Sequence, residues 1–204
     1  MIHQPIAVMA SGHGTNLAVL LEQSSKDQCP VEVRVVISNK FDAPALRIAR
    51  DAGVPTVLFI NPKEYPNRIA FDKACAQAIK DAGCQWVVLA GYMRILSSEF
   101  VKSFENQLIN IHPSLLPAFA GADGAGDALA YGAKVAGCTV HVVNEEVDGG
   151  PILAQAVVPV LNDDTRDSLH ARIQLEEYKL YPETIRRLVE HGYRLDGRRV
   201  IWND

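Results

Sequence analysis

The sequence predicts an α/β fold: a Rossmann-like, mostly parallel twisted sheet flanked by helices. Three observations predict it. Short apolar runs alternate with helical patterns through residue 104, which is typical of parallel strands joined by right-handed crossovers. Two further strand-like runs, 137–143 and 152–160, are joined by a short turn and predict an antiparallel C-terminal extension of the sheet. A helical pattern from Thr165 to about Glu190 predicts a long C-terminal helix.

The individual elements follow from short apolar runs and from helical spacing. The predicted strands are Ile6–Ala10, Val31–Ser38, Val54–Ile60, Trp86–Ala90, Leu108–Ile111, Gly137–Val143 and Ile152–Val160. The predicted helices cover 17–22, 43–52, 68–79, 97–104 and 165–190. The helix near residue 70 carries one apolar face, formed by Phe71, Ala74, Cys75, Ala78 and Ile79. We expect a single domain over 1–204, made of a half 1–104 and a half 105–204.

Three segments carry weaker signals. The glycine-rich run Ala120–Asp127 predicts a loop, followed by a helical turn or two in Ala128–Lys134. Pro182 lies inside the long C-terminal pattern and predicts a kink or split near Tyr181. The tail from Tyr193 predicts a small terminal strand or coil.

The composition narrows the class of protein. A formal net charge of −4 argues against a general nucleic-acid binder. No apolar run approaches the roughly 20 residues of a membrane span, and the N-terminus lacks a signal pattern, so we expect a cytoplasmic protein. The cysteines lack metal-like spacing and predict reduced thiols, and they are Cys29, Cys75, Cys84 and Cys138. The histidines form no metal-type cluster, so no metal is expected.

A polar pair lies at the end of the predicted strand 108–111. Asn110 and His112 are two residues apart, so strand alternation points both side chains to the same side, and Pro113 ends the strand. A histidine carries a proton near neutral pH, and an asparagine can donate to a developing oxyanion. The pattern indicates a catalytic site, with a satisfied core histidine beside a turn-forming asparagine as the alternative.

A glycine turn follows the first predicted strand. Ser11-Gly-His-Gly-Thr-Asn16 connects this strand to a helix that starts near Leu17. Backbone N–H groups and the dipole at a helix N-terminus favour an anion, so the loop indicates phosphate binding. It matches neither the dinucleotide nor the nucleoside-triphosphate motif. A plain tight turn between strand and helix remains the alternative.

Four other residues have both a functional and an ordinary interpretation. Asp148 is either a turn residue or a carboxylate that reaches His112 and stabilises its imidazolium. Gln174 and Glu177 share one helix face, which is either a ligand face or a solvated one. Arg68 lies at a helix start, where the macrodipole does not favour a cation, so it is either a surface residue or has another partner.

Together these segments resemble the phosphoribosylglycinamide formyltransferases (glycinamide ribonucleotide transformylases) of the 10-formyltetrahydrofolate formyltransferase superfamily. The resemblance runs from Ile6 to about Leu188. The matching motifs are Ser11-Gly-His-Gly-Thr-Asn-Leu17, Ala90-Gly-Tyr-Met-Arg-Ile-Leu-Ser97, Asn110-Ile-His-Pro-Ser-Leu-Leu-Pro-Ala-Phe119, Gly137-Cys-Thr-Val-His141 and Asp148-Gly-Gly-Pro-Ile152.

The resemblance implies formyl transfer from 10-formyltetrahydrofolate, the co-substrate, to the amine of glycinamide ribonucleotide in purine synthesis. It implies sugar-phosphate binding by the first half, and catalysis with folate binding by the second. The implied catalytic residues are Asn110, His112 and Asp148. The implied ribonucleotide-binding residues are Gly14, Thr15, Asn16, Gln174 and Glu177. The implied folate-binding residues are Arg68, Met93, Arg94, Ile95, Leu96, Asn110, Val143 and Asp148. It implies neither a metal nor a nucleic-acid or membrane partner, and leaves a homodimer open.

One region departs from the pattern of the family. Family members carry Pro-Gly, a histidine and further polar residues where this chain has Ala120-Gly-Ala-Asp-Gly-Ala-Gly-Asp127. Tyr178 also stands where a histidine is common. The change predicts a looser loop, with lower folate affinity or turnover. The alternatives are another 10-formyltetrahydrofolate-dependent transferase or hydrolase, or a non-catalytic sugar-phosphate-binding protein.

Overall fold

A computed structural model describes residues 3–204 of the chain, and it confirms the predicted fold class. The strands of the main sheet hydrogen-bond in the order β3-β2-β1-β4-β5-β6-β7, and β8 and β9 form a separate two-stranded sheet. The chain divides into two compact units, one ending at Ile109 and the other formed by Asn110–Asp204.

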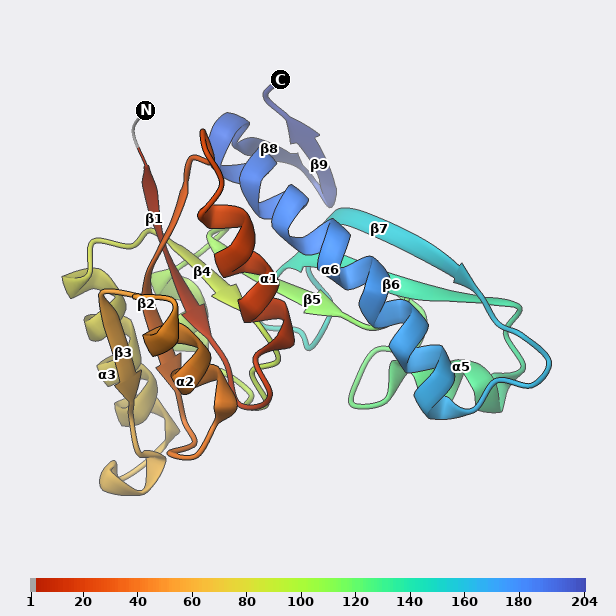
Figure 1. The fold of residues 1–204 in the computed structure, drawn as a ribbon, viewed down its shortest axis with the longest axis horizontal. Coiled ribbons are helices and arrows are strands. Elements are labelled where there is room, and N and C mark those ends of the chain that lie inside the picture. Colours follow the sequence, from red (N-terminus) through yellow and green to blue (C-terminus); the bar gives the residue numbers. More distant parts are fainter. Residues whose placement is uncertain (1–2) are drawn as a thin grey trace. The chain divides into compact units, whose positions relative to one another are not determined.

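The first unit is a parallel sheet covered by helices on both faces (Figure 1). Its strands are β1 (Gln4–Met9), β2 (Val31–Ser38), β3 (Thr56–Phe59) and β4 (Trp86–Leu89). Its helices are α1 (Thr15–Ser24), α2 (Pro44–Asp51), the 3₁₀ turn η1 (Pro62–Glu64), α3 (Arg68–Asp81) and α4 (Ser98–Ser103). β1 pairs in parallel with β2 and with β4, and β2 with β3. The carboxyl ends of these strands therefore meet at one edge, where open α/β sheets bind ligands.

The interior of the first unit explains why these segments are strands. Residues 6–10 and 35–37 are fully buried and apolar, as expected for parallel strands covered on both faces. α3 buries Phe71, Cys75 and Ile79, the i, i+4 and i+8 positions of the predicted apolar face. The same helix also buries a carboxylate, Asp72, which the apolar pattern did not predict.

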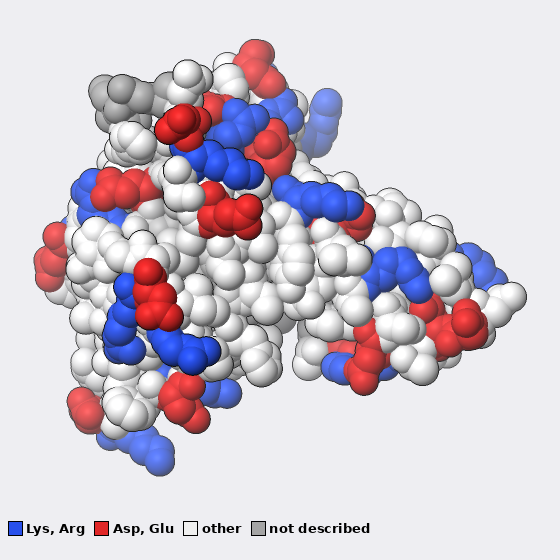
Figure 2. Space-filling model, viewed as in Figure 1, with Lys and Arg blue, Asp and Glu red and all other residues white. Residues whose placement is uncertain are grey.

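The second unit begins within β5 (Leu108–His112) and contains α5 (Gly124–Tyr131), β6 (Val135–Val142), β7 (Ile152–Pro159), α6 (Arg166–His191), β8 (Tyr193–Asp196) and β9 (Arg199–Trp202). β6 and β7 pair antiparallel, as predicted. α6 packs on both strands, and the β8–β9 hairpin contacts β7 (Figure 1). Basic and acidic side chains are interspersed on the face shown in Figure 2. On α6, Arg186 pairs with Glu183 and Glu190. This is the pattern of a solvated helix face.

The prediction of a loop over 120–127 was wrong in its second half, because α5 begins at Gly124. The carboxylate of Asp123 caps the helix by accepting from the Gly126 N–H at 3.2 Å, and it also accepts from Arg166 Nε at 2.9 and 2.8 Å. A Cβ on Gly124 would lie 2.6 Å from the Pro113 carbonyl oxygen. The glycine is therefore required by packing at a place where composition indicated a loop.

The prediction for Pro182 was wrong where it allowed a split, because α6 runs without interruption from Arg166 to His191. Thr165 caps its start in a reciprocal pair with Ser168. Leu169, Ile173, Ile185 and Leu188 form a buried stripe that anchors the helix on both sides of the proline. Tertiary packing outweighs the lost backbone hydrogen bond at Pro182.

Candidate active site

β5 carries Asn110 and His112 to the start of the second unit. Both side chains point to the side on which Asp148 and His141 lie, as strand alternation predicted. His112 is 5% exposed. The segment after it is held by Thr139 of β6, whose hydroxyl donates to the Ser114 carbonyl at 2.7 Å and accepts from the Leu116 N–H at 3.0 Å. The end of β5 is therefore fixed against β6.

Both ring nitrogens of His112 face oxygen acceptors. Nε2 lies 2.9 Å from the Phe119 carbonyl oxygen, and Nδ1 lies 3.4 Å from Asp148 Oδ2. A carbonyl oxygen can only accept, so Nε2 carries a proton. The Asp148 carboxylate offers Nδ1 an acceptor on the other side. The arrangement presents Nε2 as a hydrogen-bond donor.

His141 of β6 completes the cluster in the neutral form. Its Nδ1 donates to the Val142 carbonyl oxygen at 3.1 Å, which leaves Nε2 to accept from Asn110 Nδ2 at 3.2 Å. Burial lowers the pKa of His141, which outweighs the opposite influence of Asp148 Oδ1, 3.6 Å from Nε2. A neutral His141 therefore orients the Asn110 amide and leaves its second N–H for another acceptor.

The turn after β6 fixes the Asp148 carboxylate between the two histidines. Asp148 has a positive φ of 53°, and its Oδ2 also accepts from the Gly121 N–H at 3.0 Å. A Cβ on Gly150 would lie 1.7 Å from the Val142 carbonyl oxygen, so only glycine fits there. Val143 lies one residue beyond the end of β6, at the start of the same turn.

The glycine turn of the first unit is built from backbone. Gly14 is the N-cap of α1 with a φ of 77°, and its carbonyl accepts from the Ala18 N–H at 2.8 Å. A Cβ on Gly14 would lie 2.8 Å from Ala45 Cα in α2. Thr15 and Asn16 form the first turn of α1, where the N–H groups and the positive end of the dipole meet. The local geometry suits an anion.

The other predicted residues of the first unit lie in the segment after β4 and at the start of α3. Met93, Arg94, Ile95 and Leu96 form an irregular segment after β4, and Met93 and Ile95 are 76% and 66% exposed. Arg68 is exposed at the first turn of α3, behind the cap Asn67, whose side chain accepts from the Ala70 N–H. Among residues 3–204 it has no ion-pair partner.

Gln174 and Glu177 lie three residues apart on α6 in the second unit. The predicted alternative of a solvated face is wrong for Glu177, which is 5% exposed. Burial first and the neighbouring Glu177 carboxylate second raise the pKa of the Cys138 thiol on β6 to about 12. Glu177 therefore faces β6 rather than solvent.

The comparisons with known proteins decide the family. The model of the "Formyl transferase" family matches residues 4–185. The chain belongs to the formyl transferase family. A phosphoribosylglycinamide formyltransferase from Haemophilus influenzae is 40% identical over 190 residues, covering 93% of this chain and 89% of that protein. The crystal structure of glycinamide ribonucleotide transformylase 1 from Symbiobacterium toebii is 46% identical with a TM-score of 0.95, covering 99% and 95% of the two chains.

This formyl transferase chain also matches part of larger proteins. The trifunctional purine biosynthetic protein adenosine-3 of Bos taurus is 40% identical over 198 residues. The match covers 97% of this chain and 20% of the bovine protein, so the chain spans about a fifth of that relative.

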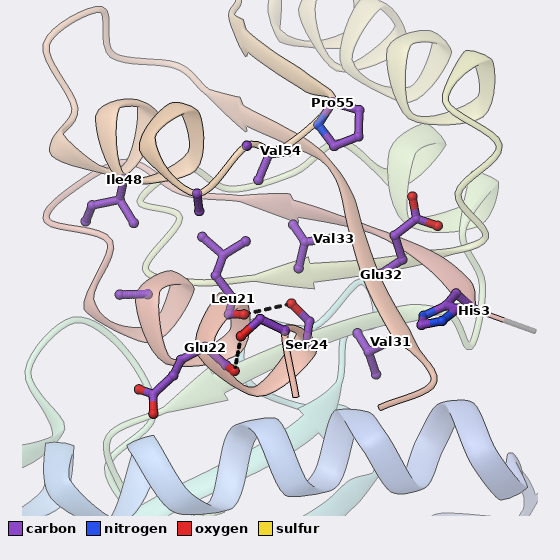
Figure 3. A pocket seen from close by; sticks show the side chains of 14 residues that line it. His3, Leu21, Glu22, Ser24, Val31, Glu32, Val33, Ile48, Val54 and Pro55 are labelled. Atoms are coloured by element: carbon purple, nitrogen blue, oxygen red, sulfur yellow. Dashed lines mark hydrogen bonds between the residues drawn. The ribbon is translucent and has the colours of Figure 1, made fainter. Parts of the chain in front are cut away.

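A groove of about 620 Å³ in the first unit of this formyl transferase chain lies away from the predicted residues (Figure 3). It is lined by the end of α1, the start of β2 and the end of α2, at the amino ends of the strands. The hydroxyls of Ser24 and Ser25 donate to the carbonyls of Leu21 and Glu22. These hydroxyls are therefore already engaged within α1.

Sequence reasoning missed two kinds of residue in this member of the family. His141 was named only as the last residue of the matching motif 137–141, with no role, and its place beside Asp148 depends on the turn after β6. Ser11 was named only as the first residue of the glycine turn and Asp72 was not named, because their partners are backbone N–H groups far away in sequence. Within residues 3–204, no group of three or more His, Cys, Asp or Glu is placed to hold a metal ion. No helix among these residues has the length and apolar character of a membrane span.

Proposed function

We propose that this formyl transferase chain moves a formyl group from 10-formyltetrahydrofolate to the amine of glycinamide ribonucleotide, a step of purine synthesis. The observation that carries the proposal is the convergence of Asn110, His112 and Asp148, with a ring nitrogen 3.4 Å from the carboxylate. The relatives named phosphoribosylglycinamide formyltransferase and their near-complete coverage support it.

The proposed chemistry uses the two donors of the cluster. The neutral amine attacks the formyl carbon, a C–N bond forms, and the formyl oxygen becomes a tetrahedral oxyanion. Nε2 of His112 and the second N–H of Asn110 stabilise this charge. Nε2 already donates to a carbonyl oxygen, that of Phe119, at 2.9 Å. In the reaction the formyl oxygen would take the place of the Phe119 carbonyl.

Collapse of the intermediate then breaks the bond between the formyl carbon and the folate nitrogen. The attacking amine loses one proton and the departing nitrogen gains one, with His112 or an ordered water as the carrier. Asp148 stabilises the imidazolium throughout by its charge and by fixing Nδ1. A buried cluster is effective here because water does not compete for the oxyanion.

The binding residues are assigned by the same proposal. The phosphate of the ribonucleotide would lie on Gly14, Thr15 and Asn16, and its glycinamide end on Gln174 and Glu177. Binding energy from the phosphate then orients the distant amine. The folate-binding residues would be Arg68 for the glutamate tail and, around the pterin ring, Met93, Arg94, Ile95, Leu96, Asn110, Val143 and Asp148. We further propose a cytoplasmic enzyme that acts without a metal, a nucleic acid or a membrane.

A direct assay tests the proposed function. Purified protein is mixed with glycinamide ribonucleotide and 10-formyltetrahydrofolate, and formation of tetrahydrofolate and formylated ribonucleotide is measured. We expect both products in equal amounts. Tetrahydrofolate without formylated ribonucleotide would indicate a hydrolase. Binding of the ribonucleotide without product would indicate a sugar-phosphate-binding protein.

The ribonucleotide site can be tested separately at Glu177. We expect Glu177→Ala to raise the KM for glycinamide ribonucleotide about ten-fold or more, because a buried carboxylate that binds a polar group is costly to lose. The KM for the folate should stay within about two-fold of wild type. Glu183→Ala, at an exposed position of α6 where it pairs with Arg186, is the control. A rise in the KM for the folate alone would show that the α6 face carrying Glu177 was wrongly assigned to the ribonucleotide.

A further inference from the structure

The segment 91–97 has no helix or strand of its own, although the proposed function places part of the folate ring on it. Met93 and Ile95 point outward and are 76% and 66% exposed, which offers apolar surface to a planar ring. An irregular segment of this kind keeps its shape only through contacts with its neighbours. All of the contacts described below lie within the first unit.

The first end of the segment is held by Ser11, at the end of β1. The Ser11 hydroxyl accepts from the Met93 N–H at 2.8 Å and donates to Asn39 Oδ1 at 2.6 Å, just after β2. The Ser11 N–H donates to the Gly91 carbonyl at 3.1 Å. Ser11 is 1% exposed, so water does not compete for these bonds. One side chain thus ties the segment to two strand ends.

The second end is held by Asp72 of α3. Its Oδ2 accepts from the Ser97 N–H at 2.7 Å, and both residues are nearly fully buried, at 2% and 1% exposure. A charged acceptor gives a stronger hydrogen bond than a neutral one. The Ser97 hydroxyl in turn caps α4 by accepting from the Phe100 N–H. Asp72 therefore determines where the segment ends and α4 begins.

The middle of the segment rests on the same helix. The Arg94 guanidinium carbon lies 4.8 Å from the centre of the Phe71 ring, the residue next to Asp72. This is a cation–π contact. Because Arg94 turns inward onto α3, its neighbours Met93 and Ile95 are left facing outward.

We propose that Ser11 and Asp72 are positioning residues that fix the two ends of segment 91–97 and thereby set the affinity for the folate ring. The inference rests on the proposed function, which places the folate on this segment. Neither side chain needs to touch the ligand. Each accepts a peptide N–H of the segment, and loss of either acceptor lets one end of the segment move.

The experiment compares Ser11→Ala, Asp72→Ala and Asp72→Asn with wild type. Two readouts are taken: the Kd of tetrahydrofolate by titration calorimetry, and the KM for 10-formyltetrahydrofolate together with kcat. We expect each alanine variant to raise Kd and KM by about three- to ten-fold, the usual effect of one lost hydrogen bond, with kcat at saturating folate within about two-fold. The amide oxygen of Asp72→Asn can still accept from Ser97, so this variant should recover most of the affinity.

Matched controls come from the same helices. Asp81→Ala removes an exposed carboxylate at the end of α3 that accepts from Gln77, and Ser103→Ala removes an exposed hydroxyl of α4. Both should leave folate affinity unchanged. If Asp72→Ala fails to fold, Ser11→Ala decides the inference alone, and wild-type affinity in that variant overturns it.

The outcomes separate the inference from the proposed function. Folded Ser11→Ala and Asp72→Ala proteins that bind tetrahydrofolate as tightly as wild type would overturn the inference while wild-type transfer stands. A fall in kcat with unchanged folate KM would also overturn it. Wild-type protein that binds no tetrahydrofolate would overturn the proposed function, and the inference with it.

Discussion

The two units present polar groups in opposite ways. In the second unit, side chains face one another: His112 and His141 lie on either side of the Asp148 carboxylate, and Asn110 donates to His141. In the first unit, the predicted ligand surfaces depend on the course of the backbone: the turn at Gly14 is itself backbone, and the irregular segment 91–97 presents Met93 and Ile95. There the polar side chains, such as Ser11 and Asp72, hold the backbone in place.

The difference teaches where each unit is sensitive to substitution. A surface made of side chains is damaged when a side chain is removed. A surface made of backbone is damaged when an atom is added, because the chain itself must approach its ligand or its neighbour closely. The predictions below test this contrast, from the largest expected effect to the smallest.

Removal of the His112 ring should have the largest effect. We expect His112→Ala to lower kcat by at least about 10²-fold, the low end for a general acid or base. The variant loses the Nε2 donor and leaves Asp148 without its partner at 3.4 Å. Steady-state formyl transfer checks this, with His191→Ala at the exposed end of α6 as the control. Turnover like that of wild type would remove His112 from the mechanism.

Neutralising Asp148 should lower the rate of formyl transfer. Asp148→Asn keeps the size of the side chain and an acceptor for the Gly121 N–H, but removes the negative charge beside both histidines. Because the His112 ring then loses the carboxylate that holds Nδ1, kcat should fall by about ten-fold. Steady-state kcat is the measurement, and Asp163→Asn in the exposed turn after β7 is the control. An unchanged kcat would argue against the pairing.

Adding one carbon to the backbone surface of the first unit should damage it. Gly14→Ala and Gly53→Ala share a positive φ, 77° and 75°, but only at Gly14 would the new Cβ meet another atom, Ala45 Cα at 2.8 Å. We expect Gly14→Ala to be less stable than Gly53→Ala by about 1–3 kcal/mol, and to raise the KM for the ribonucleotide. Urea unfolding and kinetics of both variants check this. Equal stabilities of the two variants would mean that α2 can move away from a Cβ at position 14 at little cost.

The smallest expected effect is the contribution of His141 to the pH dependence of the free energy of unfolding. Burial lowers its pKa in the folded protein below the ordinary 6.5, so the unfolded chain takes up a proton first as the pH falls. This contribution to stability is complete above about pH 6.5 and is lost as the pH falls through 6.5 toward the folded pKa. The groups facing the ring are Asp148, Asn110 and His112.

The measurement is the free energy of unfolding at a series of pH values from 7.5 to 5. We expect His141→Gln to be less stable than wild type at pH 7.5 and to lose less stability between pH 7 and 5.5. His191→Gln, at an exposed position, should follow the wild-type curve. A His141→Gln curve parallel to that of wild type would show that this ring does not contribute to the loss of stability at acid pH.

The sequence predicted correctly those features of the structure that a local pattern of residues determines. Alternation in β5 placed Asn110 and His112 on one side, and apolar runs located the strands of both units. The family resemblance predicted the residue that meets them, Asp148, which spacing alone left undecided. Their catalytic roles, and the folate and ribonucleotide contacts, stay predictions.

What the sequence did not reveal depends on contacts between distant residues. Asp72 is buried although it lies outside the apolar face predicted for α3, because its carboxylate accepts from the Ser97 N–H, 25 residues away. Glycines at 124 and 126 argued for a loop by propensity, but the Asp123 cap and the close approach to Pro113 make α5 begin there. The Asp123 cap was a readable signal, whereas the approach to Pro113 was not.

The four free thiols can report on unfolding of the chain, because a buried thiol becomes reactive only when it is exposed. Cys29, Cys75, Cys84 and Cys138 are all buried, three in the first unit and one in the second. Burial raises the pKa of Cys75 and Cys84 to about 12 and about 11, so little thiolate is available for alkylation while the fold is closed. Pulse labelling followed by peptide mapping would therefore report when each half of the chain unfolds.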